Sequence, residues 1–146
     1  MNYIDISVDL LKRKQQLTNA KSNLEDELLM LENEKFSTRH RALSDPSVAE
    51  GGGNKYEEHL VNLIVLIDNA YFRKKVVERE LKMIENGLNS LSEYEVDLLD
   101  CFYMSRVKDP LGTMINKYYK EKSSINADKR VALEKFTRSV YGLLSM

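Results

Sequence analysis

The sequence has one cysteine, two prolines and no long apolar run, and these shortages exclude several classes of structure. A single cysteine, Cys101, cannot form an intrachain disulfide framework or a zinc finger. It stands among Leu98, Leu99 and Phe102, so we expect an ordinary thiol in an apolar core. The longest apolar stretch, Leu63 to Ile67, is far too short to cross a bilayer.

Signals for strands and for export are also scarce. Val, Ile and Thr never alternate with polar residues over the length of a strand, so no β-sheet is expected. Asp5 and Asp9 interrupt the first ten residues, which therefore do not resemble a signal peptide. We expect a helical protein that is cytoplasmic and has no membrane partner.

Residues that could carry chemistry are few. His40 and His59 have no second histidine or carboxylate at ligand spacing on a shared helical face, and we interpret both as chance occurrences. The run Gly51 to Gly53 has no Gly-Lys-Ser/Thr after it and no strand before it, which argues against a phosphate-binding loop. No nucleophile elbow or paired-carboxylate pattern is present. The sequence predicts no catalytic residue, no metal and no cofactor, and hence no enzyme.

The chain does contain strong helical periodicity. Residues 3 to 38 predict one long helix, in which leucines at positions 10, 17, 24 and 31 form a seven-residue repeat suited to a coiled-coil seam. Residues 36 to 54 lose this pattern to Ser, Asp, Pro and Gly, and predict a flexible connection. The first predicted segment is therefore residues 1–54.

Residues 55–90 predict a second long helix, with a length of roughly 54 Å at ~1.5 Å per residue. A helix of this length needs a partner, and two remain open: the first helix in an antiparallel hairpin, or a second copy of the chain as a homodimer. Gly87, together with Asn86 and Asn89, predicts that the helix ends or bends near there. The predicted packing seam consists of Leu60, Leu63, Ile67, Val77, Leu81 and Ile84, interrupted by Lys74.

Residues 91–146 carry the signals of a helix-turn-helix. Ser92 and Glu95 form a capping box that begins one helix, and Asp109 followed by Pro110 begins a second. Lys120 to Lys122 predict the turn, and Ser123 or Ser124 is expected to cap the last helix. A short helix, a polar turn and a serine-capped longer helix are the order found in helix-turn-helix proteins.

Positive charge is concentrated in the same region. Between Arg106 and Arg138 there are nine Lys/Arg and four Asp/Glu, a formal charge of about +5, whereas the whole chain is formally -1 and the remainder is therefore about -6. A local basic patch on an acidic body favours binding to double-stranded DNA. The predicted base contacts are Ser123, Ser124, Asn126, Ala127 and Arg130, and the predicted phosphate contacts are Lys117, Lys120, Lys122 and Lys129.

The motifs of this C-terminal part resemble a known family. They are Leu91-Ser92-x-x-Glu95-x-x-Leu98-Leu99-x-x-Phe102-Tyr103, then Lys117-Tyr118-Tyr119, then Ser123-Ser124-Ile125, and finally Ala132-Leu133-x-Lys135-Phe136. Together they look like sigma-factor region 4, in the version found in small phage and prophage transcriptional activators of the RinA/ArpU type. The resemblance covers about residues 55 to 144. It implies activation of phage late genes with host RNA polymerase as a partner.

Two functional interpretations follow. The first is a sequence-specific transcriptional regulator: an all-α protein with long coiled-coil-like helices and a C-terminal helix-turn-helix. The second is a coiled-coil interaction protein, an adaptor or an inhibitor of a host protein, that does not bind DNA. The long apolar seam suits both, and Glu134 on the expected DNA side favours the second.

Overall fold

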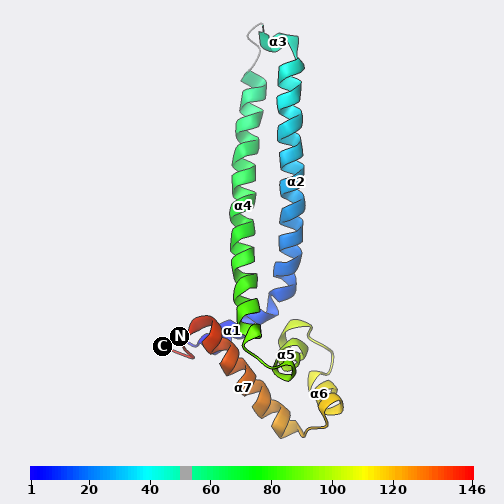
Figure 1. The fold of residues 1–146 in the computed structure, drawn as a ribbon, viewed down its shortest axis with the longest axis vertical. Coiled ribbons are helices and arrows are strands. Elements are labelled where there is room, and N and C mark those ends of the chain that lie inside the picture. The colour runs from blue at the N-terminus through cyan, green and yellow to red at the C-terminus, as the bar shows by residue number, and fades with distance from the viewer. Residues whose placement is uncertain (50–53) are drawn as a thin grey trace. The chain divides into compact units, whose positions relative to one another are not determined.

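A computed structural model describes residues 1–49 and 54–146. Within these ranges the chain is mostly helical, and its only β-type pairing is one isolated antiparallel bridge between Asn2 and Ser145. The predicted all-α fold is therefore confirmed, while the glycine run from 51 to 53 lies outside the described residues. The elements (Figure 1) are α1 (Tyr3–Lys12), α2 (Lys14–Ser44), α3 (Pro46–Ala49), α4 (Asn54–Asn89), α5 (Glu93–Leu99), the π-helical segment η1 (Asp100–Met104), α6 (Pro110–Tyr118) and α7 (Lys122–Tyr141).

The chain forms two compact units. The hairpin unit consists of Asn19–Glu78, and the terminal unit combines Met1–Thr18 with Arg79–Met146. These units divide the chain differently from the predicted segments 1–54, 55–90 and 91–146, because the first residues belong with the C-terminal helices.

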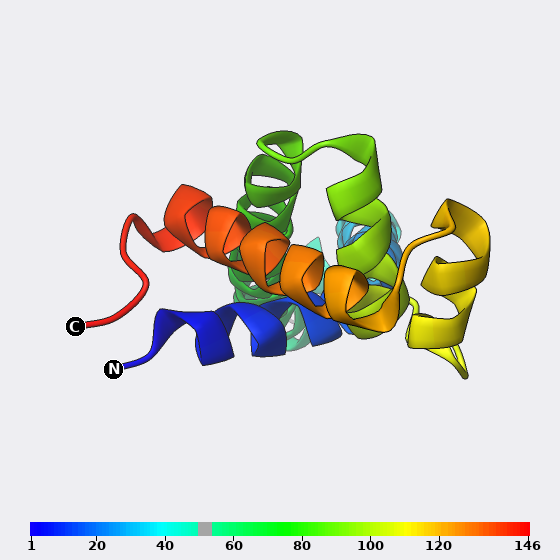
Figure 2. The same cartoon turned by 90° about the horizontal axis from the view of Figure 1, so that it is seen from below.

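The predicted single helix over residues 3 to 38 is wrong. α1 ends at Lys12, Arg13 closes it, and α2 starts at Lys14 and continues through Ser44. The break has a packing reason: Ser7, Leu10 and Leu11 are buried on α1, which contacts α7 and η1. Figure 2 shows α1 lying alongside α7.

The two ends of the chain are joined within the terminal unit. The Tyr3 amide donates to the Leu144 carbonyl at 2.9 Å, and the Met146 amide donates to the Met1 carbonyl at 3.0 Å. The rings of Tyr3 and Tyr141 stack at a centroid distance of 5.3 Å. The buried hydroxyls of Ser7 and Thr137 lie 2.9 Å apart and form a further link between α1 and α7.

α2 and α4 run antiparallel in the hairpin unit (Figure 1), so the seam closes within one chain. Leu28 packs with Ile67 and Ala70, and Leu31 covers this cluster from one side. All six predicted seam residues are covered to some degree: Leu63, Ile67 and Ile84 are buried, whereas Leu60, Val77 and Leu81 are half-buried. Of the two partners considered for the long helix, the structure contains the intramolecular one.

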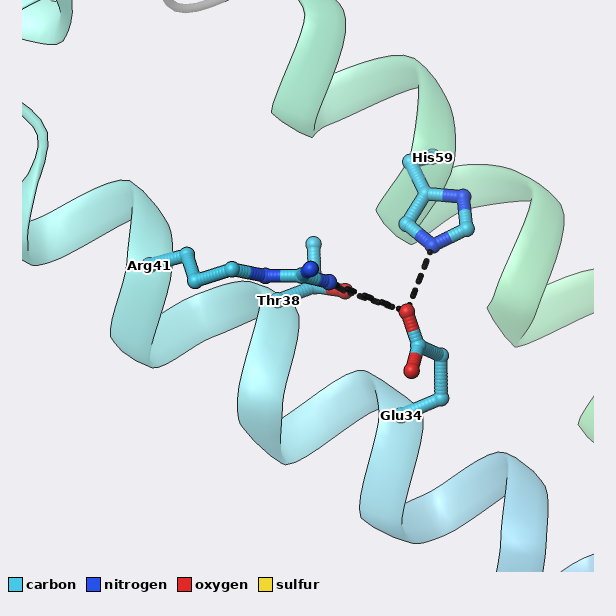
Figure 3. Close-up of polar contacts among 4 residues, drawn as sticks. All are labelled: Glu34, Thr38, Arg41 and His59. Atoms are coloured by element: carbon cyan, nitrogen blue, oxygen red, sulfur yellow. Dashed lines mark hydrogen bonds and ion pairs between the residues drawn. The ribbon is translucent and has the colours of Figure 1, made fainter.

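Polar pairs link the two helices on one side of the hairpin. Arg73 pairs with Glu27 at 2.7 Å, and His59 lies 3.2 Å from Glu34. Arg41 also donates to Glu34, at 3.0 Å, and to the buried hydroxyl of Thr38 (Figure 3). The hydrogen bond from His59 is the main reason that the pKa of Glu34 lies below its ordinary value.

One prediction fails in this region. The flexible connection predicted from residue 36 onward is wrong for residues 36 to 44, which are the last turns of α2, with Thr38 buried. His59 also makes a contact that the sequence did not predict, because it links α4 to Glu34 of α2. The carboxylate partner of His59 stands on a different helix, so a search along one helical face could not find it.

α4 ends at Asn89, two residues after Gly87, so the predicted end of the long helix near this residue is confirmed. The predicted start of α5 is confirmed, because Ser92 and Glu95 form both bonds of the capping box.

The chain then stays helical through η1, which places Cys101 in the core as expected. This core consists of Leu98, Cys101, Met114 and Ile125, with Tyr94, Phe102, Val107, Leu111, Ile115 and Tyr118 packed around it.

Candidate nucleic-acid interface

α6 forms the first helix of the candidate interface, and its start follows the prediction. The carboxylate of Asp109 accepts from the amide of Gly112 at 3.1 Å, and Pro110 occupies the first helical position. Met114 is fully buried, while Leu111, Ile115 and Tyr118 are half-buried. The apolar face of α6 therefore fixes the helix against the core of the terminal unit.

The turn between α6 and α7 differs from the prediction. Tyr119 closes α6 in the left-handed region, with φ of 55°, and its amide donates to the Ile115 carbonyl. α7 begins at Lys122, and Glu121 precedes it in extended conformation without a side-chain cap. Lys122 is thus the first helical residue and not part of the turn, and neither Ser123 nor Ser124 caps the helix.

The first two turns of α7 present a polar face. Ile125 is fully buried, whereas Ser123, Asn126, Ala127 and Arg130 are exposed or half-exposed, as is Ser124. The Arg130 side chain is 80% exposed and only approaches Glu134, at 4.0 Å. The predicted base-contact residues therefore lie on one accessible stretch of α7.

The four predicted phosphate-contact lysines are in different surroundings. Lys117 pairs with Asp97 at 2.6 Å, and Lys120 pairs with Asp128 at 2.9 Å. Lys120 also lies over the ring of Tyr94 at 4.4 Å, and Lys129 lies over the ring of Phe102 at 4.3 Å. Lys122 is exposed and has no ion pair or hydrogen bond within the parts of the chain that the structure describes.

Asp128 ties α7 to α5. Its Oδ2 atom accepts from the Tyr94 hydroxyl at 2.7 Å as well as from Lys120. These two donors, Tyr94 first, hold the pKa of Asp128 below its ordinary value. Burial, followed by the bond to Asp128, raises the pKa of the Tyr94 hydroxyl. A neutral tyrosine and a charged aspartate therefore fix the start of α7 against α5.

Asp97 has the same role for α6. Its Oδ2 atom accepts from Lys117 and from the Tyr118 hydroxyl, both at 2.6 Å. These two hydrogen bonds, that from Lys117 first, lower the pKa of Asp97. Asp97 also lies within 4.8 Å of ligand atoms of Asp100 and Cys101. Because its carboxylate already holds two donors from α6, we interpret the cluster as a hydrogen-bonded anchor for that helix.

Tyr119 is not among the predicted DNA-contact residues, but it lies at the candidate interface. Its side chain is 93% exposed, and its left-handed backbone is strained for a residue with a Cβ atom. The pair Tyr118-Tyr119 does indicate that one of the two rings is exposed, because two adjacent residues of a helix cannot both face the core. The exposed ring stands between the two helices of the candidate interface.

Comparison with protein-family models, with curated proteins and with solved structures gives no match for this chain. None of its helices in residues 1–49 and 54–146 combines the length and the apolar character needed to span a membrane.

Proposed function

We propose that this protein binds double-stranded DNA in a sequence-specific manner through α6 and α7, and that it regulates transcription. The observation that carries the proposal is the accessible polar stretch of Ser123, Asn126, Ala127 and Arg130 on a helix whose opposite side is anchored by Ile125. Arginine can contact guanine in a bidentate manner, asparagine can do so with adenine, and alanine can meet the thymine methyl group.

The lysines contribute unequally to phosphate binding. Lys122 is unpaired within the described residues and stands at the amino-terminal end of α7, where helix amides also favour an anion. Lys117 and Lys120 must first leave Asp97 and Asp128, although exposed pairs of this kind contribute only about 0.2–1 kcal/mol each. We therefore assign the main phosphate contact to Lys122.

The resemblance to phage activators of the RinA/ArpU type extends the proposal to late-gene promoters in the cytoplasm, with host RNA polymerase as the protein partner. On this interpretation α6 and α7 read the promoter, while another surface of the chain meets the polymerase.

A second candidate function rests on the surface of the hairpin unit. Among the described residues, eleven of the sixteen large exposed apolar side chains belong to residues 19–78. Such a surface is typical of proteins that bind other proteins. It favours a coiled-coil adaptor or an inhibitor of a host protein, acting without DNA.

Fluorescence anisotropy with the full chain tests the first proposal. Promoter fragments from the neighbourhood of the gene would be compared with scrambled DNA at about 50 and 200 mM salt, because phosphate contacts weaken steeply over this range. A preference of several-fold for one fragment that persists at the higher salt is expected. Equal binding to all fragments, or none, would contradict sequence-specific recognition.

Three variants assign the contacts. Arg130→Ala should relax the preference at one base position and lose about 1–3 kcal/mol of binding free energy. Lys122→Ala should weaken binding to every fragment and reduce the salt slope by about 1. Arg39→Ala is the matched control, because Arg39 is exposed on α2 and equally unpaired within the described residues. Wild-type binding by the first two variants would show that α7 is not the contact surface.

A further inference from the structure

The outward face of α4 carries a row of exposed apolar side chains. Val61, Val65, Phe72 and Val76 are 59%, 60%, 68% and 45% exposed. Ile67 is buried in the seam with α2 and serves as the reference direction. With about 100° of rotation per residue, all four side chains point between about 120° and 180° away from that direction around the helix axis. They therefore form a second apolar stripe on α4 outside the buried seam, and Phe72 and Val76 at one end of it also border the open groove lined by Leu24 and Glu27 of α2.

The spacing of this stripe is the same when it is read in either direction. Steps of four, seven and four residues separate its members, and the midpoint falls between Asp68 and Asn69. A second α4 packed antiparallel about this midpoint would place its Val76 opposite Val61 and its Phe72 opposite Val65. A surface with this property is self-complementary, as the interface of a two-fold symmetric dimer requires.

The charges at the ends of the stripe obey the same symmetry. Glu58 stands three residues before Val61, and Arg79 stands three residues after Val76. The antiparallel arrangement would therefore bring each Glu58 to an Arg79 of the second copy. Both residues are exposed, and neither has an ion pair or a hydrogen bond within the described residues. By contrast, Arg73 on the same helix is already paired with Glu27.

The composition of α4 gives an independent reason for a second partner. Residues 60 to 67 include seven apolar residues and one polar residue, Asn62, so that apolar side chains occur on every side of the helix. A helix of this kind is normally buried all round. α2 buries Leu63 and Ile67 but leaves Val61 and Val65 exposed. One helical partner is therefore not enough for this part of α4.

The size of the stripe sets the expected strength of association. Its four side chains expose roughly 300 Å² of surface per copy, taking ~100 Å² for a fully exposed valine and ~200 Å² for phenylalanine. This is less than half of the ~800 Å² that each partner buries in a standard interface. Weak association, in which the dimer is populated only at high protein concentration, is the expected result.

We propose that the outward face of α4 is a self-association surface, on which a second copy of the chain packs antiparallel about a two-fold axis between Asp68 and Asn69. The surface is independent of the nucleic-acid interface on α6 and α7. A dimer formed in this way carries two such interfaces.

Sedimentation velocity of the full chain, from about 2 to 200 µM, tests the proposal. The wild type should shift from monomer to dimer across this range, and Phe72→Asp should stay monomeric. Phe36→Asp is the matched control, because Phe36 is 74% exposed on α2 and should leave the dimer intact. Circular dichroism of each variant confirms that it is folded. A monomeric wild type at 200 µM, or a dimer lost in Phe36→Asp and kept in Phe72→Asp, would overturn the proposal.

Charge reversal tests the symmetry itself. Glu58→Arg and Arg79→Glu should each weaken the dimer several-fold, because each places like charges together twice in the symmetric pair. The double variant restores opposite charges and should recover most of the wild-type association. Failure of the double variant to recover would show that the two residues do not meet, and would contradict the antiparallel arrangement.

Discussion

Gly87 of α4 lies against the ring of Phe136 of α7, with no space for a side chain between them. A Cβ atom at position 87 would stand 2.4 Å from Cε2 of Phe136 and 2.7 Å from Cγ2 of Val140. Both Gly87 and Phe136 are buried. The glycine therefore marks the place where α7 approaches the backbone of α4. This contact explains why glycine occurs here, although it weakens a helix by about 1 kcal/mol relative to alanine.

Gly87→Ala should lower the free energy of unfolding by about 1–3 kcal/mol, although alanine is the better helix former, because the added methyl group overpacks this contact. Urea denaturation followed by circular dichroism measures the effect. Asn86→Ala, at the exposed neighbouring position, should stay within about 0.5 kcal/mol of the wild type. A more stable Gly87→Ala would mean that α7 does not pack closely here.

Asp97 should make stability depend on acid pH. Lys117 and Tyr118 lower the pKa of Asp97 in the folded state. The contribution of Asp97 to the free energy of unfolding is therefore complete above its unfolded pKa of about 3.9, and it is lost as the pH falls through its folded pKa. Asp97→Asn should lower the free energy of unfolding at pH 7 by about 1–2 kcal/mol and flatten its decline below about pH 4. Denaturation at a series of pH values measures both. Asp26→Asn, at an exposed and unpaired position within the described residues, should keep the wild-type slope.

Tyr119→Gly should raise the free energy of unfolding by about 1 kcal/mol. Glycine adopts the left-handed backbone at this position without the strain imposed by a Cβ atom, and it is the usual residue after a helix end. Tyr119→Ala is the control, since alanine removes the ring but keeps the strain, and it should give no such gain. If both variants gained equally, exposure of the ring and not backbone strain would be the cause.

The fragment 91–146 should not fold by itself. α1 supplies Ser7, Leu10 and Leu11 to the terminal unit, and all three are buried. The isolated fragment should show weak helical circular dichroism and no cooperative melting. A longer fragment of residues 79–146, mixed with a peptide of residues 1–18, should regain both. Cooperative melting of the fragment 91–146 alone would contradict this dependence on α1.

Local chemistry determines which parts of the fold can be predicted from the sequence. The capping box at Ser92 and the start of α6 at Asp109 and Pro110 depend on residues within one helical turn, and both are confirmed. The break at Arg13 depends on α7, more than one hundred residues away in sequence, and the periodic pattern does not reveal it. Periodicity identifies the α4 seam, but not the helix that covers it.

The same distinction applies to the candidate interface. Helical angles correctly place Asn126, Ala127 and Arg130 on the accessible side of α7. Counting charges cannot show that Lys117 is held by Asp97, twenty residues earlier, because that pair exists only once α5 and α6 have packed. The prediction of the turn is wrong for a similar reason: a left-handed Tyr119 is an unusual choice that residue preferences do not anticipate.

The contact between α1 and α7 also imposes an order on folding during synthesis. Leu11 leaves the ribosome 125 residues before Phe136, a delay of about 6–25 s at ~5–20 residues per second. The whole hairpin unit, Asn19–Glu78, is translated within that interval and needs no later residue for its own seam. During this time the buried face of α1 has no α7 to pack against, so Leu10 and Leu11 stay exposed on the nascent chain until the residues of α7 have been made.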